Sequence, residues 1–207
     1  MFKTKDKKRR SGMIRKVMSL FFVMLLVFGS EALCQGASFE ADMLYEMQGQ
    51  PAQHSKFYMK DNVYLFDLEM YGKHLRLVVY RNQNSMVMMD FTEKSYTRMS
   101  AMDGAFFDPF MAHYYMLKQY KVRTAGKETV NGLRCQKREL IMGEEDTVVV
   151  QRAWISDKYD FPVKLINYSG SGGKNVHMKV ELKNIKEVPV DSAIFKIPEG
   201  LKYMEMK

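Results

Sequence analysis

Apolar and polar residues alternate with a period of two along most of the chain after residue 38. Tyr64, Phe66 and Leu68, for example, fall on one side of such a run. Successive side chains of a β-strand point to opposite faces, so the alternation predicts strands with one buried face. Short turns separate the runs, which predicts an antiparallel meander in a mostly β chain of the α+β class. The expected strands span residues 38–47, 56–60, 63–70, 74–81, 86–90, 95–100, 120–130, 133–141, 147–156, 163–168 and 176–186.

One segment, residues 103–120, interrupts the strands and is predicted to be helical. Asp108 can cap its first turn, and Pro109 suits the first helical position, where no N–H is needed. Phe110 and Tyr114 lie at helical spacing on an apolar stripe. An apolar helix set into an antiparallel sheet is expected to lie against the concave face. It then either completes a core or covers a cavity, and the sequence leaves both alternatives open.

The N-terminus has the layout of a secretory signal peptide. Residues 3–16 carry eight Lys and Arg, and an uncharged apolar run follows at residues 17–28. A basic region, a short hydrophobic core and a small-residue exit predict export to the periplasm or beyond. A membrane anchor would need about 20 apolar residues, so an uncleaved anchor is the weaker alternative. Residues 1–32 are therefore predicted to be removed, with Met13 an alternative start.

Cleavage after Ala32 leaves residues 33–207 as a single domain, and cuts after Cys34 or Gly36 are alternatives. Leu33 stands where a lipidation signal needs a small residue, so acylation of Cys34 is disfavoured. A retained Cys34 could pair with Cys135 in an oxidising compartment, whereas its removal would leave Cys135 as a lone thiol.

The formal charge of +8 resides mostly in the predicted signal peptide. Residues 1–32 hold eight bases and two acids, which leaves 24 bases and 22 acids in the rest of the chain. Recognition of nucleic acid needs a clustered basic face. The mature chain is therefore not expected to bind nucleic acid.

No motif for catalysis or metal binding is found in the sequence. The four histidines His54, His74, His113 and His177 are scattered, without a His-x-x-x-His pair. There is no Gly-x-Ser-x-Gly segment to present a nucleophile. We therefore expect a protein that is not an enzyme and has neither a metal nor a cofactor.

Methionine is unusually abundant, with 19 residues, of which 15 follow residue 32. Several lie on or near the predicted helix. Methionine is flexible and polarizable, so it suits surfaces that accommodate variable apolar shapes. The alternatives are a core merely filled by Met and an adaptable apolar cavity walled by Met and Phe.

Three motifs resemble a known group of proteins: residues 39–43, residues 126–135 ahead of a strand that holds Trp154, and residues 190–201. They resemble an uncharacterised family of exported bacterial proteins. The layout is similar to the LolA/LolB-like superfamily of periplasmic lipoprotein carriers, which includes envelope-stress sensors of the RseB type. The resemblance implies a curved antiparallel half-barrel, a central helix covering its concave face over a hydrophobic cavity, and a periplasmic address.

These observations lead to a hypothesis of a periplasmic, non-enzymatic carrier or sensor that binds a lipid or the acyl chain of a lipoprotein. The alternative is an envelope protein–protein interaction module without a lipid ligand. Transient contact with a membrane surface is compatible with either hypothesis. The residues expected to line the cavity or its lid are Met88, Phe106, Phe107, Phe110, Met111 and Tyr114.

Overall fold

The computed structural model describes residues 37–143, 148–169 and 175–205. The chain divides into two units, Met1–Gly36 and Ala37–Lys207, and every described residue belongs to the second. The predicted signal peptide and Cys34 therefore lie outside the described residues. Within those ranges, none of the helices has the length and hydropathy needed to cross a membrane.

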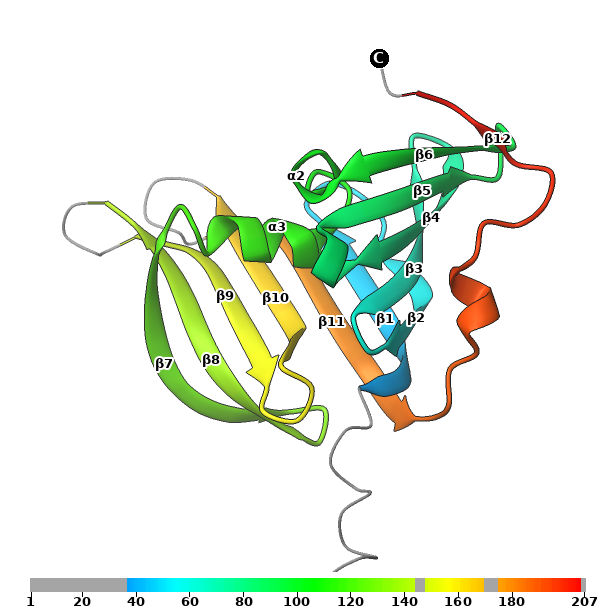
Figure 1. The fold of residues 1–207 in the computed structure, drawn as a ribbon. Coiled ribbons are helices and arrows are strands. Elements are labelled where there is room, and N and C mark those ends of the chain that lie inside the picture. The colour runs from blue at the N-terminus through cyan, green and yellow to red at the C-terminus, as the bar shows by residue number, and fades with distance from the viewer. Residues whose placement is uncertain (1–36, 144–147, 170–174, 206–207) are drawn as a thin grey trace, which may run out of the picture. The chain divides into compact units, whose positions relative to one another are not determined.

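The described strands form one twelve-stranded sheet (Figure 1). Its order is β12-β6-β5-β4-β3-β2-β1-β11-β10-β9-β8-β7, and all pairs are antiparallel except β12 with β6. The mostly β fold with an antiparallel sheet is thus confirmed. The strands are β1 (Ser38–Met47), β2 (Gln53–Lys60), β3 (Val63–Met70), β4 (Lys73–Tyr80), β5 (Ser85–Asp90), β6 (Ser95–Ser100), β7 (Lys121–Val130), β8 (Leu133–Met142), β9 (Val148–Ser156), β10 (Phe161–Ser169), β11 (Asn175–Glu187) and β12 (Lys202–Tyr203).

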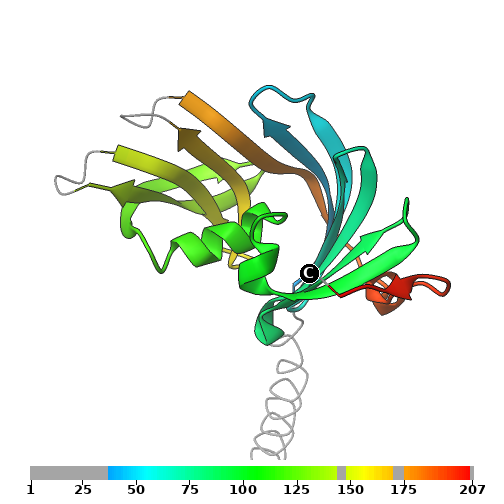
Figure 2. The ribbon, with the colours of Figure 1, turned by 90° about the horizontal axis from the view of Figure 1, so that it is seen from above.

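Two meanders, β1–β6 and β7–β11, are joined side by side through the pairing of β1 with β11. Residues 101–120 connect β6 to β7, and these two strands lie near opposite edges of the sheet. A connection between opposite edges has to cross one face of the sheet. Figure 2 shows this connection, which we call the strap, on the inner side of a curved sheet.

The strap contains two short helices, α2 (Ala101–Gly104) and α3 (Pro109–Met116), where the sequence predicted one helical segment at 103–120. The reason lies at Asp108, whose backbone is extended with φ −119° and ψ 108°. A proline disfavours the helical conformation in the residue before it, so Pro109 starts a new helix and cannot continue an old one. Because α3 has only eight residues, it lies against part of the concave face and does not span the predicted length.

The core lies on both faces of the sheet. The largest cluster fills the concave side and includes the buried rings of Phe39, Phe57 and Tyr64. On the opposite side of β3–β5, a second cluster contains Phe195 of the 3₁₀-helix η2 (Ser192–Phe195). Phe195 belongs to the motif at residues 190–201 and is buried in this second cluster.

Most strands match the predicted ranges, with one instructive difference at Pro162. The strand expected at residues 163–168 begins two residues earlier, because Phe161 and Pro162 both lie within β10. The pairing of β10 with β9 shifts register between Pro162 and Lys164. Proline lacks the N–H needed for a ladder, so it is tolerated inside a strand at such an irregularity.

Candidate functional site

Side chains from distant strands meet beneath the strap. Strands β3 and β10 are four places apart in the sheet, which corresponds to about 19 Å in a flat sheet at ~4.8 Å per strand. Yet the rings of Tyr64 and Phe161, on these two strands, have centroids only 5.3 Å apart. The curvature of the sheet therefore brings its two halves into direct contact through these side chains.

Phe110 of α3 occupies the junction between the two halves. Its ring lies 4.9 Å from that of Phe161 and 5.9 Å from that of Tyr64, measured between centroids. Phe57 and Phe66 contact the same ring at 5.5 Å and 6.2 Å. Phe110 is 0% exposed. The sequence left open whether the helix completes a core or covers a cavity. At Phe110 it completes a core.

A buried carboxylate holds the start of α3. Asp108 accepts a hydrogen bond from the Phe110 N–H through Oδ1, and the Tyr64 hydroxyl donates to its Oδ2 at 2.5 Å. Burial raises the pKa of Asp108 to about 6, and the bonds from Tyr64 and Phe110 oppose that rise. Burial likewise raises the pKa of Tyr64 well above its usual value. The Asp108 carboxylate thus caps α3 and also links the strap to β3 through the hydrogen bond from Tyr64.

A second buried polar pair joins α3 to β9. The Gln151 amide donates to Asn167 Oδ1 at 2.7 Å, which leaves Gln151 Oε1 as an acceptor facing His113 Nδ1. This arrangement assigns the Nδ1–H tautomer to His113. Its Nε2 is buried and has no hydrogen-bond partner in the described part of the chain. Burial, and then the charge of Arg138, lower the pKa of His113, so the ring is neutral near pH 7.

A third attachment comes from the end of the β4 hairpin. Arg81, in the 3₁₀-helix η1 (Arg81–Gln83), donates from Nη2 to the Tyr114 hydroxyl at 3.1 Å. Its guanidinium also lies over the rings of Tyr114 and Phe161, 5.3 Å and 5.4 Å from their centroids. Arg81 thereby bridges α3 and β10.

The structure places the six residues predicted for the lining in different environments. Phe110 and Met111 are buried in the concave cluster, and the partly buried Met88 and Phe107 pack against it. Tyr114 is partly buried and contacts Arg81. Phe106 differs from the others because it is 73% exposed and faces solvent.

The methionines near the strap mostly fill the core. Met86, Met99 and Met111 are buried in the concave cluster, and Met89 is buried on the opposite face. Met102, which is exposed, is an exception. The core-filling alternative therefore describes these four buried methionines.

The remaining candidates lie away from the strap. An open depression of about 500 Å³ lies near the ends of β1 and β11 and contains none of the six predicted residues. Cys135 is a free, buried thiol whose pKa is raised by burial. No three His, Cys, Asp or Glu side chains among the described residues gather as metal ligands. The open depression near the ends of β1 and β11 is lined by Glu46, Met47, Gln48, Gln50, Ala52, Val176, His177 and Lys179.

The polar side chains under α3 attach the strap to the sheet. Asp108 and His113 are both fully buried and engaged with side chains of the sheet. Sequence reasoning identified Asp108 as a cap and placed Tyr64 on an inward face, but it missed their bond and the roles of Phe161, Arg81 and Gln151. In the sequence, only the period-two pattern of β3 pointed to Tyr64 as a buried residue. No local pattern marks Asp108 as its hydrogen-bond partner.

No family model matches the chain, and no curated protein matches it in sequence. Among solved structures, an uncharacterized conserved protein from Thermus thermophilus aligns with 8% identity and a TM-score of 0.57, over 83% of this chain and 91% of that one. MucB, also solved in complex with MucA from Pseudomonas aeruginosa, aligns with 12% identity and a TM-score of 0.43, over 80% of this chain and 59% of its own. A LolA superfamily protein from Nitrosomonas europaea aligns with 11% identity and a TM-score of 0.35, over 79% of this chain and 91% of its own. Identities this low reflect fold alone. The solved structures that the chain resembles include a LolA superfamily protein, and the sequence motifs resembled the same superfamily.

Proposed function

We propose that this chain is an exported, non-enzymatic binding protein that takes up a lipid or a lipoprotein acyl chain beneath the strap. The observation that carries the proposal is the position of Phe110. A single ring on a short helix occupies the apolar junction between the two halves of the sheet. In this proposal Phe110 is a plug that an apolar chain replaces.

The strap is suited to movement because the sheet does not depend on it. Each strand of the sheet is paired with neighbouring strands, whereas α3 is attached through the buried side chains of Phe110 and Met111 and a few side-chain hydrogen bonds. Helices shorter than about 12–15 residues are marginal on their own in water, so α3 needs these contacts to remain helical. Loss of the contacts would release α3 and leave the strands paired.

The energies involved permit such an exchange. Exposing the Phe110 ring costs about 1.5–3 kcal/mol, whereas burying about 15 methylenes of an acyl chain yields ~12 kcal/mol before association costs. Association and ordering cost several kcal/mol. The gain exceeds the combined cost of exposing Phe110 and breaking the three polar attachments of α3 at about 1 kcal/mol each, before the association cost is subtracted.

The proposal is tested by fluorescence titration with a fluorescent fatty acid, combined with hydrogen exchange of the strap. Saturable uptake is expected, together with faster exchange of the α3 amides of Ala112 and Leu117 and unchanged protection of the strands. Lipid extraction and mass spectrometry of protein from its host are expected to recover an acyl-containing molecule. Protein that is repeatedly recovered empty and takes up no probe would contradict the proposal.

A matched pair of variants sharpens the test. Phe110→Ala enlarges the space beneath the strap, so it is expected to bind the probe at least threefold more tightly because less has to be displaced. Leu65→Ala removes a similarly buried side chain from the opposite face of β3 and is expected to leave probe affinity unchanged. Equal effects of the two variants would mean that the probe binds elsewhere.

The alternative function, an envelope protein-interaction module, is favoured by the observation that aromatic rings already fill the space around Phe110. Arg76 and Arg152 are poor probes of it because they pair with Asp67 and with the buried Glu139. Arg98 of β6 is exposed and has no ion pair among the described residues, so its replacement leaves the fold intact.

Under the alternative, Arg98→Glu is expected to weaken retention of an envelope partner at least tenfold by reversing a surface charge. The measurement is quantitative co-purification from crosslinked cells, with Lys118→Glu as a charge-matched control on the strap. Equal retention by wild type and the Arg98 variant, together with acyl-probe uptake, would rule out this use of the surface.

A further inference from the structure

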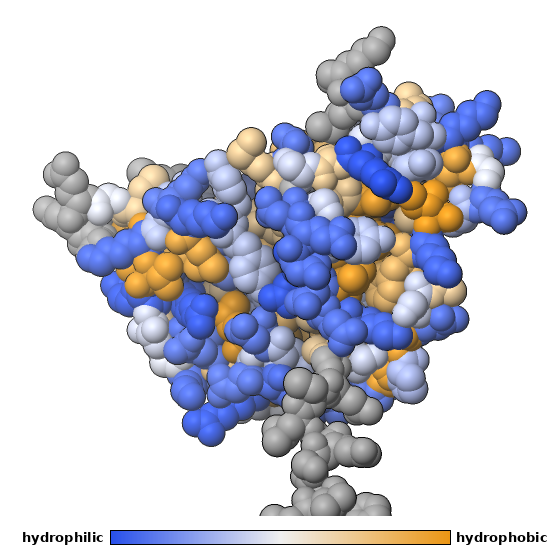
Figure 3. All heavy atoms as spheres, viewed as in Figure 1, coloured by the Kyte–Doolittle hydropathy of each residue, from blue (hydrophilic) through white to orange (hydrophobic). Residues whose placement is uncertain are grey.

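The inner face of the sheet differs in chemistry between its two halves. On β2 and β3 it carries aromatic side chains such as Phe57 and Phe66. On β9 and β10 the cross-strand pair Gln151 and Asn167 lies beside α3 instead, and the Gln151 amide donates to Asn167 Oδ1. Figure 3 shows hydrophilic residues over much of the half formed by β7–β11. The surface beneath the strap therefore has an apolar end and a polar end.

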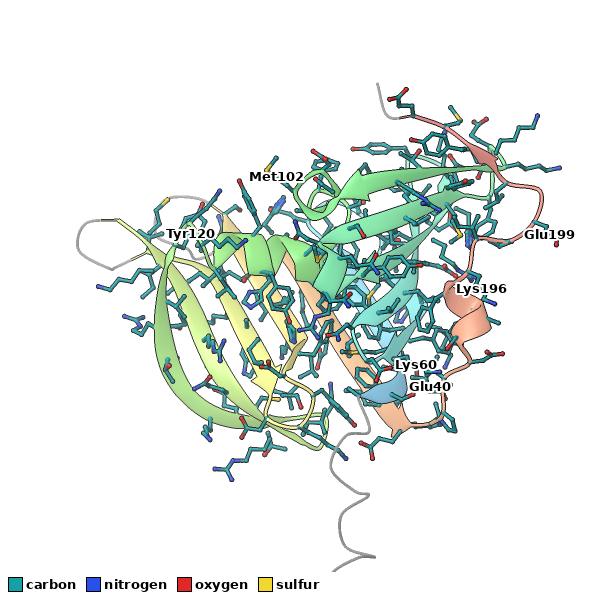
Figure 4. All side chains as sticks on the ribbon, in the orientation of Figure 1. Glu40, Lys60, Met102, Tyr120, Lys196 and Glu199 are labelled. Atoms are coloured by element: carbon teal, nitrogen blue, oxygen red, sulfur yellow. The ribbon has the colours of Figure 1, made fainter. Side chains whose placement is uncertain are left out.

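The helix α3 runs from one of these ends to the other. Phe110, near its start, contacts aromatic rings, and His113, three residues later, contacts Gln151. Figure 4 shows Met102 and Tyr120 toward the two ends of the strap, with α3 between them. Three residues span about 4.5 Å along a helix axis. A ligand whose tail takes the place of Phe110 can therefore lay its other end on the polar side chains of the second half.

Arg138 of β8 supplies the charge of the polar end. Its backbone is paired with that of Ala153, a buried residue of the concave cluster, so both side chains lie on the inner face. Its guanidinium is half-buried and donates from Nε to Gln136 Oε1 at 2.8 Å. Burial lowers the pKa of His113, and the charge of Arg138 lowers it further. Arg138 is therefore close enough to α3 for its charge to act there.

The charge of Arg138 is not neutralised by the protein. Among residues 37–143, 148–169 and 175–205, no carboxylate forms an ion pair with it. Arg123 and Arg152, by contrast, both pair with Glu139. Arginine is seldom withdrawn from water without a partner. Its guanidinium has five N–H donors in a fork that fits the oxygens of a carboxylate or a phosphate, and the described residues use one of them.

From these observations we propose that Arg138 binds the anionic head of the acyl ligand, a carboxylate or a phosphate, while the tail takes the place of Phe110. The assignment rests on the proposed function and adds the chemical class of the ligand. A charged head cannot follow the tail into the aromatic junction, because burying an unpaired charge is costly. The ligand is then an acyl compound with an anionic group at one end.

The test compares three fluorescent probes that share one acyl chain: the fatty acid, its methyl ester and the corresponding lysophosphatidic acid. Titrations are made at pH 8, where both acids are ionised, and below the concentration at which the probes aggregate. Wild type is expected to bind the two acids at least tenfold more tightly than the ester, because hydrogen bonds to charged groups are the stronger ones. Tighter binding of the phosphate assigns a phospholipid, and tighter binding of the carboxylate assigns a fatty acid.

Two variants act on the charge in different ways. Arg138→Gln is expected to remove the preference, so that acids and ester bind within about twofold of each other, with the ester bound as by wild type. Gln136→Glu keeps the acceptor of the Arg138 Nε–H and adds a carboxylate beside it, so it is expected to reduce the preference at least fivefold. Arg98→Gln is the matched control, because Arg98 is exposed and paired with Val87 of the outer cluster. It is expected to keep the full preference.

The outcomes separate this assignment from the proposed function. Equal affinity of wild type for acids and ester would overturn the role of Arg138 and leave acyl binding intact. A preference that persists in Arg138→Gln would also overturn it, because the charge that selects the head would then lie elsewhere. If none of the three probes binds, the proposed function fails, and the assignment of Arg138 fails with it. Circular dichroism verifies that each variant is folded.

Discussion

Replacing Phe110 with alanine is expected to lower the free energy of unfolding by about 3–5 kcal/mol. The ring is fully buried and contacts four other rings, from β2, β3 and β10. Its removal takes away the apolar burial and leaves a space that rigid aromatic neighbours fill only in part. The measurement is urea unfolding followed by tryptophan fluorescence and by circular dichroism.

Phe106→Ala is the matched control, since the two phenylalanines are four residues apart on the same strap. Phe106 is largely exposed, so its replacement is expected to change the free energy of unfolding by no more than about 0.5 kcal/mol. Similar losses for both variants would mean that the strap is not seated as described. A small loss for Phe110→Ala would mean that the ring is dispensable to the core.

Replacing Asp108 with asparagine is expected to remove a pH-dependent loss of stability. The pKa of Asp108 is 3.8 in its ordinary state and about 6 when buried under the strap. Because the folded state holds the proton more tightly, the group stabilises the fold below pH 4, and this contribution is lost as the pH rises through 6. The difference corresponds to about 2 kcal/mol between pH 4 and pH 7.5. Asparagine can still accept the Phe110 N–H and does not ionise.

The measurement is the free energy of unfolding at pH 4, 5, 6 and 7.5 for wild type and variant. Asp108→Asn is expected to gain about 2 kcal/mol relative to wild type over this range, and Asp103→Asn on the exposed part of the strap is expected to gain none. His113 acts in the opposite direction, since its lowered pKa causes stability to fall as the pH drops below about 6.5. The comparison of variants cancels that contribution. A difference that does not change with pH would contradict the burial of an ionisable Asp108.

The strands were predictable because one buried face leaves a period-two trace in the residues. The ranges 38–47, 63–70 and 95–100 coincide with β1, β3 and β6. The turn between β7 and β8 is formed by Asn131–Gly132, a dipeptide that tight hairpin turns favour. Strand ends were less accurate where pairing extends a strand past a local breaker, as at Pro162 in β10.

The break in the strap is encoded by the dipeptide Asp108–Pro109. Asp108–Pro109 marks a helix start, and the same dipeptide implies that no helix continues through it from residue 103. The structure also shows that the outer and inner sides of the strap differ, with Phe106 exposed and Phe110 buried. Two adjacent apolar turns look alike in sequence, and the sheet beneath them determines which one is covered.

Local order along the chain is enough to determine an antiparallel β protein with one helical interruption, because strand periodicity and turn chemistry act between close neighbours. The residues that meet beneath the strap could not be derived in that way. Tyr64 touches Phe161 and bonds to Asp108, and His113 faces Gln151, because β1 pairs with β11 and curls the two meanders toward each other. Contacts between residues this far apart depend on the curvature of the whole sheet, which no short stretch of residues encodes.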